Sequence, residues 1–218
     1  MRLSLIGMSG SGKSHWSKKL VEDGFKAFYC DDMIEQRLAC ELNGPDGRRL
    51  EVGQWMGFPY EDGYRRRESK YLSYEKSVLA DILSMIDNFG GTSWSNLVID
   101  TTGSVIYVGD EILTNLRRLT TVVHLETPPE VQDQMLAAYL ENRRPVLWRN
   151  FFNKDPDETN DAALARCYSL LLSRRERLYR QWADITIDYA THSKKELSSG
   201  EFIEMIIDRY GKLMRYKK

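Results

Sequence analysis

The chain carries, close to its start, the stretch Gly7-Met8-Ser9-Gly10-Ser11-Gly12-Lys13-Ser14. It matches the phosphate-binding pattern G-x-x-x-x-G-K-[ST] at every fixed position. Glycines let several backbone N–H groups point inward at a polyphosphate, and the free N–H groups of a following helix favour the same anion. We expect Lys13 to reach the β- and γ-phosphates and the Ser14 hydroxyl to bind Mg²⁺. The expected ligands are therefore ATP and Mg²⁺, bound by Gly7, Ser9, Gly10, Ser11, Gly12, Lys13, Ser14 and the adjacent His15.

The residues on both sides of this loop favour a strand–loop–helix unit over an ordinary glycine turn. Residues 3–6 form a short apolar run that is typical of a buried strand, and residues 17–21 continue a helix that we expect to stop at Gly24. A phosphate-binding loop requires this order of elements. The context therefore supports a nucleotide site.

Length and composition indicate one globular domain over residues 1–218. The net charge of −1 argues against a protein that binds nucleic acid or membrane surfaces through bulk electrostatics. No apolar run is long enough to span a membrane, and a strand that begins at Leu3 leads us to expect no signal peptide. The three cysteines are not spaced for a metal site and indicate reduced thiols. We expect a cytoplasmic monomer or homodimer.

Arginines occur in local clusters along the chain. Such clusters suit phosphate clamps and a small anionic substrate, because the guanidinium group donates paired hydrogen bonds to oxyanions. The alternative is that they lie on solvated helix faces in inexpensive surface ion pairs. The clusters are Arg48-Arg49, Arg65-Arg66-Arg67, Arg117-Arg118, Arg143-Arg144 and Arg174-Arg175-Arg177.

Apolar runs and helical periodicity alternate along the rest of the chain. We expect strands at 3–6, 26–30, 97–100, 121–125 and 185–188, and helices after the first at 34–41, 52–56, 64–89, 111–119, 130–140, 161–182 and 199–214. This alternation predicts an α/β fold with a parallel sheet covered on both faces. Ligands then bind beyond the carboxyl ends of the strands, which places Asp31 and Asp100 beside the glycine loop.

Residues 142–160 are polar, aromatic and interrupted by proline, without helical or strand periodicity. A connection of this length in a compact domain predicts a lid over the site. Trp148, Phe151 and Phe152 lie within it. Their rings are suited to stacking on adenine, to closing over the phosphoryl acceptor or to packing within the lid itself, and these alternatives stay open.

Several stretches resemble the shikimate kinase family and occur in the order of that family. They are Cys30-Asp31-Asp32-Met33-Ile34-Glu35, Tyr64-Arg65-Arg66-Arg67-Glu68, Thr101-Thr102-Gly103, Arg143-Arg144-Pro145-Val146-Leu147 and Arg175-Glu176-Arg177-Leu178-Tyr179. The resemblance extends over almost the whole chain. It implies a P-loop kinase fold with a five-stranded parallel sheet in the order 2-3-1-4-5, an acceptor-binding region at about 31–75 and a lid at about 142–160.

The resemblance also implies roles for individual side chains. Asp31 is expected to bind the attacking hydroxyl of the acceptor and to serve as its base, while Arg65 and Arg175 hold the carboxylate of the acceptor. Arg144 is expected to reach the transferring phosphoryl group when the lid closes. Thr101, Thr102 and Gly103 stand where the family has three glycines, and the resemblance places them beside the acceptor.

The chain departs from the family pattern on the acceptor side. Tyr29 replaces the first acid of the family's D-x-D stretch, so Asp32 or Asp100 is expected to supply the carboxylate near Mg²⁺. Thr101 and Thr102 replace two glycines and are expected to narrow or redirect the acceptor pocket. Other small hydroxylated compounds are therefore candidate acceptors alongside shikimate.

Each of these residues also has a structural interpretation. Asp31 is suited to capping the helix that follows, and Asp100 to closing a strand with satisfied hydrogen bonds. Arg65 and Glu68 lie one helical turn apart and suit an intrahelical ion pair.

The sequence favours an ATP- and Mg²⁺-dependent kinase that phosphorylates a hydroxyl of a small, anionic metabolite. A nucleoside, nucleotide or gluconate-type kinase is an alternative, since a nucleobase would stack on aromatic residues between Trp55 and Tyr64. A second alternative is an ATP-binding module without kinase turnover.

Overall fold

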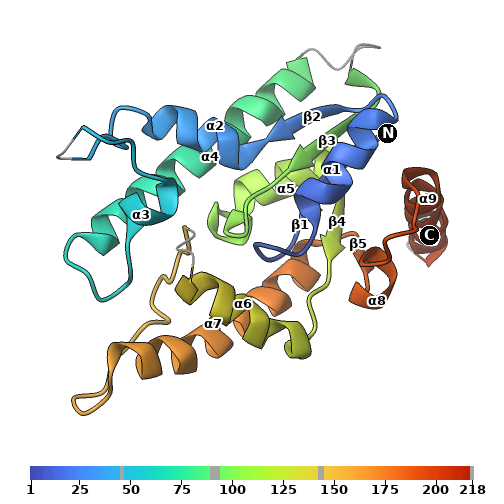
Figure 1. Ribbon diagram of the computed structural model, residues 1–218. Helices are drawn as coiled ribbons and strands as arrows, with labels where there is room; N and C mark the ends of the chain where they lie inside the picture. Colours follow the sequence, from blue (N-terminus) through green and yellow to red (C-terminus); the bar gives the residue numbers. More distant parts are fainter. Residues whose placement is uncertain (45–46, 89–93, 142–144, 217–218) are drawn as a thin grey trace.

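The computed structural model describes residues 1–44, 47–88, 94–141 and 145–216. Its centre is a five-stranded sheet in the order β2-β3-β1-β4-β5, in which every neighbouring pair of strands is parallel (Figure 1). The predicted α/β fold and strand order are confirmed. The strands are β1 (Arg2–Ile6), β2 (Lys26–Tyr29), β3 (Leu97–Asp100), β4 (Thr121–Leu125) and β5 (Ile185–Ile187).

Most helices lie within one or two residues of their predicted bounds. They are α1 (Lys13–Glu22), α2 (Cys30–Leu38), α3 (Val52–Met56), α4 (Tyr64–Asn88), α5 (Asp110–Leu119), α6 (Pro129–Glu141), α7 (Asn160–Trp182), α8 (Tyr189–His192) and α9 (Ser199–Tyr216). The prediction missed the short α8 and a 3₁₀ helix, η2 (Val105–Tyr107). Each has fewer residues than a periodic pattern needs in order to be recognised.

Helix α2 begins four residues earlier than predicted. Cys30 is its first residue, so Asp31 and Asp32 lie in its first turn, where the helix dipole favours negative charge. The residue that caps the helix is Tyr29, and no side chain makes a capping hydrogen bond there. Asp31 therefore does not cap α2, contrary to the alternative considered above.

The register of the sheet brings the ends of three strands together. Leu5 of β1 pairs with Asp100 of β3, and Asp100 pairs on its other side with Tyr29 of β2. Because the strands are parallel, the loops that follow them leave the same edge of the sheet. The loop after β1, the start of α2 and the residues after Asp100 are therefore neighbours.

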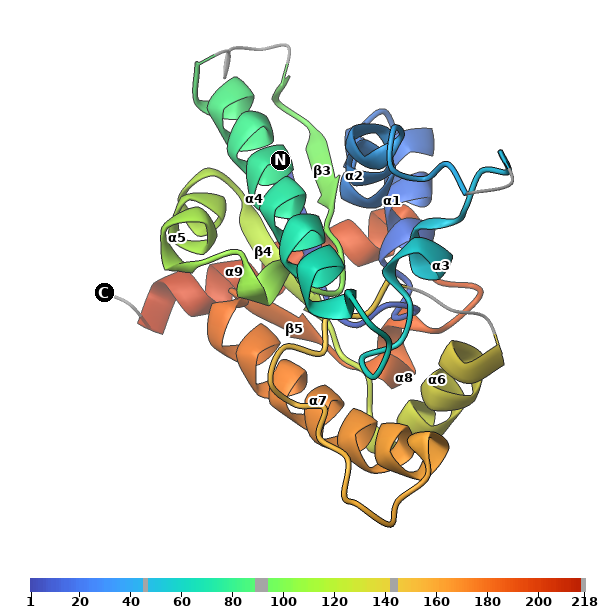
Figure 2. The same ribbon diagram turned by 90° about the vertical axis from the view of Figure 1, so that its left-hand side faces the viewer.

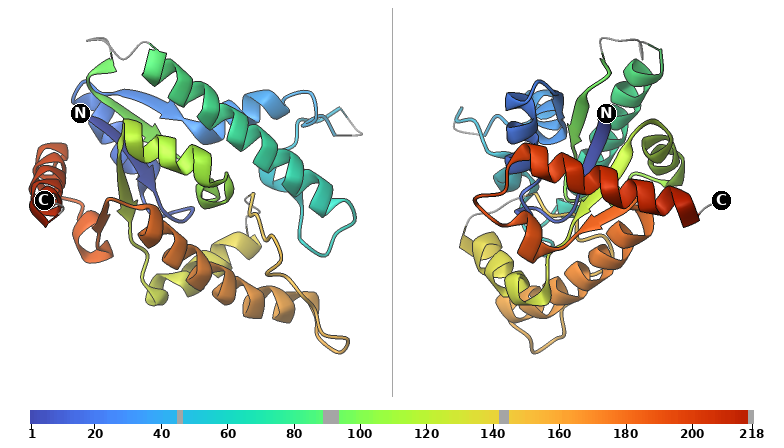
Figure 3. Two further views of the ribbon diagram at one scale, coloured as in Figure 1. Left: turned by 180° about the vertical axis from the view of Figure 1, so that it is seen from behind. Right: turned by 90° about the vertical axis from the view of Figure 1, so that its right-hand side faces the viewer.

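Two hydrophobic cores cover the two faces of the sheet. Helices α4, α5 and α7 cover the face that is toward the viewer in Figure 2, and they share a large core that includes Ile6, Ile34, Ile82 and Leu171. Helices α1 and α9 cover the opposite face, seen with α9 across the front in the right-hand view of Figure 3. The sheet is thus buried on both sides, as its continuous apolar strands require.

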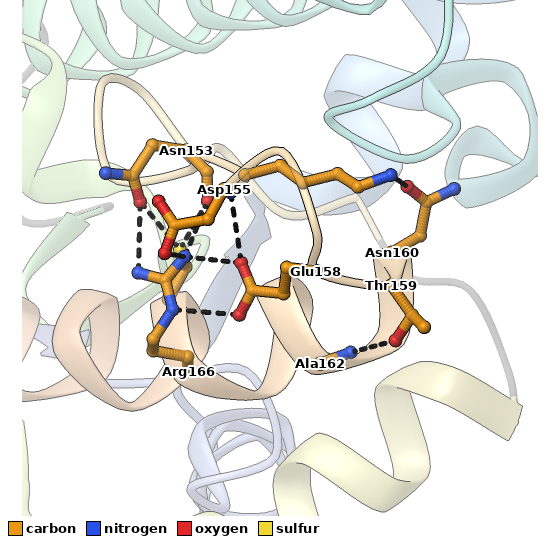
Figure 4. Close-up of polar contacts among 9 residues, drawn as sticks. Asn153, Asp155, Glu158, Thr159, Asn160, Ala162 and Arg166 are labelled. Atoms are coloured by element: carbon orange, nitrogen blue, oxygen red, sulfur yellow. Dashed lines mark hydrogen bonds and ion pairs between the residues drawn. The ribbon is translucent and has the colours of Figure 1, made fainter.

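The described part of the predicted lid, residues 145–159, is anchored to α7. Arg166 donates hydrogen bonds to Glu158 at 2.7 and 2.9 Å and to the side chain and carbonyl of Asn153 at 3.2 and 3.1 Å (Figure 4). Thr159 caps α7 by accepting a hydrogen bond from the backbone N–H of Ala162. Residues 142–144 of the predicted lid lie outside the described residues.

The packing of α9 predicts how much it stabilises the fold. The Phe202 ring stacks on Trp16 of α1 with ring centres 4.0 Å apart, and both side chains are fully buried. We expect Phe202→Ala to lower the free energy of unfolding by about 3–5 kcal/mol in urea denaturation, since it removes a buried ring and leaves a cavity. The matched control is Ile207→Ala on the exposed side of α9, which should change stability by less than about 0.5 kcal/mol. Equal effects of the two variants would contradict this packing.

Candidate active site

The glycine loop between β1 and α1 adopts a conformation that requires glycine. Gly7, Gly10 and Gly12 all have positive φ angles, of 147°, 85° and 95°. A Cβ atom on Gly7 would lie 2.8 Å from the carbonyl oxygen of Leu125, so space as well as φ excludes a side chain there. The loop ends at the N-terminus of α1, where unpaired N–H groups favour an anion.

Lys13 is buried at the base of this loop. Its ammonium group donates hydrogen bonds to the carbonyls of Gly7 and Met8 at 3.0 and 2.9 Å. Burial lowers the pKa of Lys13, while the nearby carboxylates of Asp100 and Asp31 act in the opposite direction. The cation is therefore held between the loop and two acids, on the side where phosphates would lie.

Ser14 and Asp100 lie together beside Lys13. The Ser14 hydroxyl hydrogen-bonds to the Asp100 carboxylate. Burial raises the pKa of Asp100, and the bond from Ser14 and the charge of Lys13 oppose that rise. A hydroxyl and a carboxylate in contact are oxygen ligands of the kind that Mg²⁺ prefers.

Asp31 lines the same cavity and is exposed to solvent there. Its carboxylate accepts a hydrogen bond from the Tyr71 hydroxyl at 3.1 Å. Burial raises the pKa of Asp31, and Lys13 and Tyr71 oppose the rise. A carboxylate with a raised pKa near a lysine is suited to accepting a hydrogen bond from a substrate hydroxyl.

Gly103 brings the end of β3 against the glycine loop. A Cβ atom on Gly103 would lie 3.0 Å from the backbone nitrogen of Ser9, so glycine permits this close approach. The Tyr179 hydroxyl donates a hydrogen bond to the carbonyl of Gly103. Thr101 does not reach the cavity, because its hydroxyl donates to the carbonyl of Leu5 at 2.7 Å inside the sheet. Thr102 does line the cavity.

Glu75 is a buried acid that the sequence reading missed. It comes from α4 and lies behind the wall formed by Thr102 and Ser104, whose hydroxyls both donate to its carboxylate. Burial raises the pKa of Glu75 to about 7, although these two hydrogen bonds lower it. The signal in the sequence was an acid on the apolar face of a helix, in the stripe of Leu72 and Leu79.

Arg175 of α7 forms the opposite wall and is buried. One terminal nitrogen donates to the carbonyl of Leu147 at 2.8 Å, and the guanidinium lies 5.6 Å from the centre of the Tyr107 ring. Within the part of the chain that the structure describes, the Nε atom of Arg175 has no hydrogen-bond partner. A buried cation at the wall of a cavity is suited to an oxyanion ligand, which its guanidinium group can bind through paired hydrogen bonds.

Arg65 does not line the cavity that Arg175 lines. Its side chain is exposed and makes a long contact, 3.5 Å, to Asn150. Glu68 is buried and accepts hydrogen bonds from the Tyr64 hydroxyl and the backbone N–H of Arg149, at 3.0 and 2.6 Å. The ion pair between Arg65 and Glu68 considered above is not among the described contacts.

One cavity of about 730 Å³ connects the two sides of the site. Its lining residues come from the glycine loop, α2, the start of α3, α4, the residues after β3, residues 145–146 and α7, whose helices are labelled in Figure 1. Arg144 lies outside the described residues. The predicted site residues that line the cavity are Ser9, Gly10, Gly12, Lys13, Ser14, His15, Asp31, Asp32, Thr102, Gly103 and Arg175.

The aromatic residues between Trp55 and Tyr64 do not form a stacking slot in this cavity. Phe58 and Tyr60 stack on each other with ring centres 5.4 Å apart, and Trp55 faces a separate, smaller hollow beside α4. Trp148 is fully buried against Tyr139 and Tyr168. Trp148 therefore packs against α6 and α7, whereas Phe151 and Phe152 are only partly buried, so the alternatives for these two rings stay open.

The site suits a metal ion that is held largely by phosphates. In the described ranges of the chain, no cluster of three or more His, Cys, Asp or Glu side chains is placed to hold a metal ion. Mg²⁺ bound with a nucleotide needs only one or two protein oxygens, with phosphates and water completing its shell. Ser14 and Asp100, with Asp32 in the first turn of α2, match that requirement.

Of the described helices, none combines the length and the apolar character that a membrane span requires.

The family-model match indicates one protein family, and the solved structures share its fold. The family model described as shikimate kinase matches residues 59–207 of the chain. A comparison with curated protein sequences found no match.

Solved structures share the fold at low sequence identity. The shikimate kinase from Acinetobacter baumannii in complex with shikimate has a TM-score of 0.59 and 21% identity, covering 100% of this chain and 94% of that one. The enzyme from Aquifex aeolicus has a TM-score of 0.55 and 22% identity, covering 96% and 95%. The enzyme from Bacteroides thetaiotaomicron has a TM-score of 0.61 and 18% identity, covering 95% and 98%. Identities this low establish the fold and do not identify the substrate.

The raised pKa of Glu75 predicts a stability that depends on pH. The folded protein keeps the Glu75 proton up to a pH of about 7, whereas the unfolded chain releases it near 4.5. Glu75 therefore contributes a loss of stability as the pH rises from 4.5 to 7, and this contribution is absent in Glu75→Gln, which has no proton to lose. Between pH 5 and 8, we expect the variant to gain about 2–3 kcal/mol relative to wild type in urea denaturation. A constant difference across this range would contradict the assignment.

Proposed function

Because the chain belongs to the shikimate kinase family, we propose that it transfers the γ-phosphoryl group of ATP to a hydroxyl of a small hydroxylated carboxylic acid, shikimate or a related acid. Membership makes it a P-loop small-molecule kinase. One observation supports the proposal above the others: Lys13, Asp31 and Arg175 line the same cavity. A phosphate-binding cation, a hydroxyl-binding acid and a carboxylate-binding cation are the groups that this transfer needs.

The nucleotide side follows from the glycine loop. Its N–H groups and the ammonium of Lys13 would hold the β- and γ-phosphates. Ser14, with Asp100 behind it and Asp32 nearby, would hold Mg²⁺. The bound ion would neutralise charge that develops on the phosphates during transfer.

The acceptor side uses Asp31 and Arg175. Asp31 would accept the hydrogen bond of the attacking hydroxyl and align it with the phosphoryl group, with Tyr71 fixing the carboxylate through the bond at 3.1 Å. Arg175 would bind the substrate carboxylate through the part of its guanidinium group that lines the cavity. Its burial strengthens this contact, since water does not compete inside the cavity.

Two roles suggested by the family stay as proposals without further support. Arg144 would reach the transferring phosphoryl group. Arg65 would bind the acceptor only after moving from its exposed position beside Asn150. For Thr101 we propose a structural role, since its hydroxyl is committed to the carbonyl of Leu5.

Replacement of Lys13 tests the nucleotide side. We expect Lys13→Met to lower the kcat of acid-dependent ADP formation by about 100-fold or more, because it removes the charge that the phosphates face. The reaction is measured with shikimate, quinate and gluconate, and with nucleosides to test the alternative acceptor class. Lys18→Met, on the exposed side of α1, is the matched control and should retain full activity. Wild-type protein that binds ATP yet phosphorylates none of these compounds would be a non-catalytic module.

Replacement of Arg175 tests the acceptor side. Arg175→Lys keeps the charge but removes the planar fork and the Nε donor, so we expect the KM for the acid to rise about 10- to 100-fold. The KM for ATP should change little. The neighbouring, exposed Arg174→Lys is the control. An unchanged KM for the acid in Arg175→Lys would show that the carboxylate binds elsewhere.

A further inference from the structure

Glu75, Thr102 and Ser104 form a buried polar cluster behind the acceptor side of the cavity. The Thr102 hydroxyl donates to one carboxylate oxygen of Glu75, and the Ser104 hydroxyl donates to the other at 2.7 Å. The two hydroxyl oxygens are 3.0 Å apart, and the backbone N–H of Ser104 donates to the Thr102 hydroxyl at 3.1 Å. Thr102 and Ser104 line the cavity, and Glu75 lies behind them with no exposed surface.

Burying this carboxylate costs stability, and its surroundings offset only part of the cost. Among the described ion pairs, none includes Glu75, so the two hydroxyls are its direct partners there. An apolar side chain at this position of α4 would pack without that cost. A buried acid that lowers stability and lies at the wall of a binding cavity therefore indicates a role in that site.

The cluster decides which way the hydroxyl protons point. It contains three close oxygen–oxygen contacts but only two hydroxyl protons when Glu75 is ionised. Both protons then point at the carboxylate, so the hydroxyl oxygens of Thr102 and Ser104 have only lone pairs left for a ligand, and one lone pair of Thr102 already accepts from the backbone N–H of Ser104. A wall of this kind accepts hydrogen bonds and gives none.

We propose that Glu75 is a positioning residue for the acceptor: through Thr102 and Ser104 it makes the cavity wall accept a hydrogen bond from a second hydroxyl of the substrate. The inference rests on the proposed function, in which Asp31 takes the reacting hydroxyl and Arg175 the carboxylate. It narrows the substrate class to acids with at least two hydroxyls. A monohydroxy acid would leave the wall unpaired and bind more weakly.

The charges that face Glu75 come from several elements. Asp31 of α2 raises its pKa, and Arg175 of α7 lowers it. Cys30, Tyr71 and Tyr179 also interact with it electrostatically. With a pKa of about 7, Glu75 orients both hydroxyls fully only above neutral pH. Acceptor affinity should therefore rise as the pH increases through 7, in addition to any change due to Asp31.

The test compares KM for the acid and for ATP in the full-length protein. The probe is whichever of shikimate, quinate and gluconate the wild type phosphorylates. We expect Glu75→Gln and Thr102→Val each to raise the KM for the acid about tenfold or more and to leave the KM for ATP within about twofold. Thr102→Ser, which keeps the hydroxyl, should restore most of the affinity. Glu75→Gln should also flatten the rise of kcat/KM through pH 7.

Two controls separate positioning from stability and from function. Val78→Ala removes a buried side chain one turn along α4 and should lower the melting temperature without changing the KM for the acid. If Glu75→Gln does not fold, Ser104→Ala and Thr102→Val carry the test. An unchanged KM for the acid in these variants, with an active wild type, would overturn the positioning role alone. A wild type that phosphorylates no acid would overturn the proposed function and this inference with it.

Discussion

The pairing of β1 with β3 is the constraint on which the site depends. It sets Leu5 beside Asp100, and the Thr101 hydroxyl strengthens the pairing by donating to the carbonyl of Leu5. With this register, Ser14 reaches Asp100, and Gly103 approaches the backbone of Ser9 so closely that a Cβ atom there would lie 3.0 Å from the Ser9 nitrogen. The glycine loop and the wall formed by Thr102 and Gly103 are therefore held together by the pairing of two parallel strands. Preorganisation of this kind is most of what a kinase contributes to phosphoryl transfer.

The candidate site also depends on a balance between positive and negative groups around the cavity. Lys13 and Arg175 are buried cations, and Asp31, Asp100 and Glu75 are the acids around them. Burial raises the pKa of each of these acids, so the folded protein pays for keeping them near the cavity. Substrates would bring further negative charge in their phosphates and carboxylate. In the proposed function the two cations bind these groups, while the hydroxyls of Thr102 and Ser104 donate to Glu75.

The fold could be predicted from the sequence because its signals are local. The glycine loop, the apolar run of residues 97–100 and the periodicity of α4 each occupy adjacent residues, and parallel strands then determine where their ends meet. The acceptor side could not be predicted in full, because it depends on which way side chains point across the core. Arg65 and Arg175 looked equivalent in the sequence, yet one is exposed and the other buried. Glu75 is recognisable only once α4 is packed against the end of β3.

The central claim is that Arg175 and the wall of Thr102 and Ser104 together receive one polyhydroxylated acid. A crystal structure of the protein with ADP, Mg²⁺ and the acid that it phosphorylates tests this claim most directly. We expect the substrate carboxylate within hydrogen-bond distance of the guanidinium group of Arg175, and a substrate hydroxyl donating to Thr102 or Ser104. A carboxylate bound away from Arg175, or an acid that makes no contact with these two hydroxyls, would contradict it.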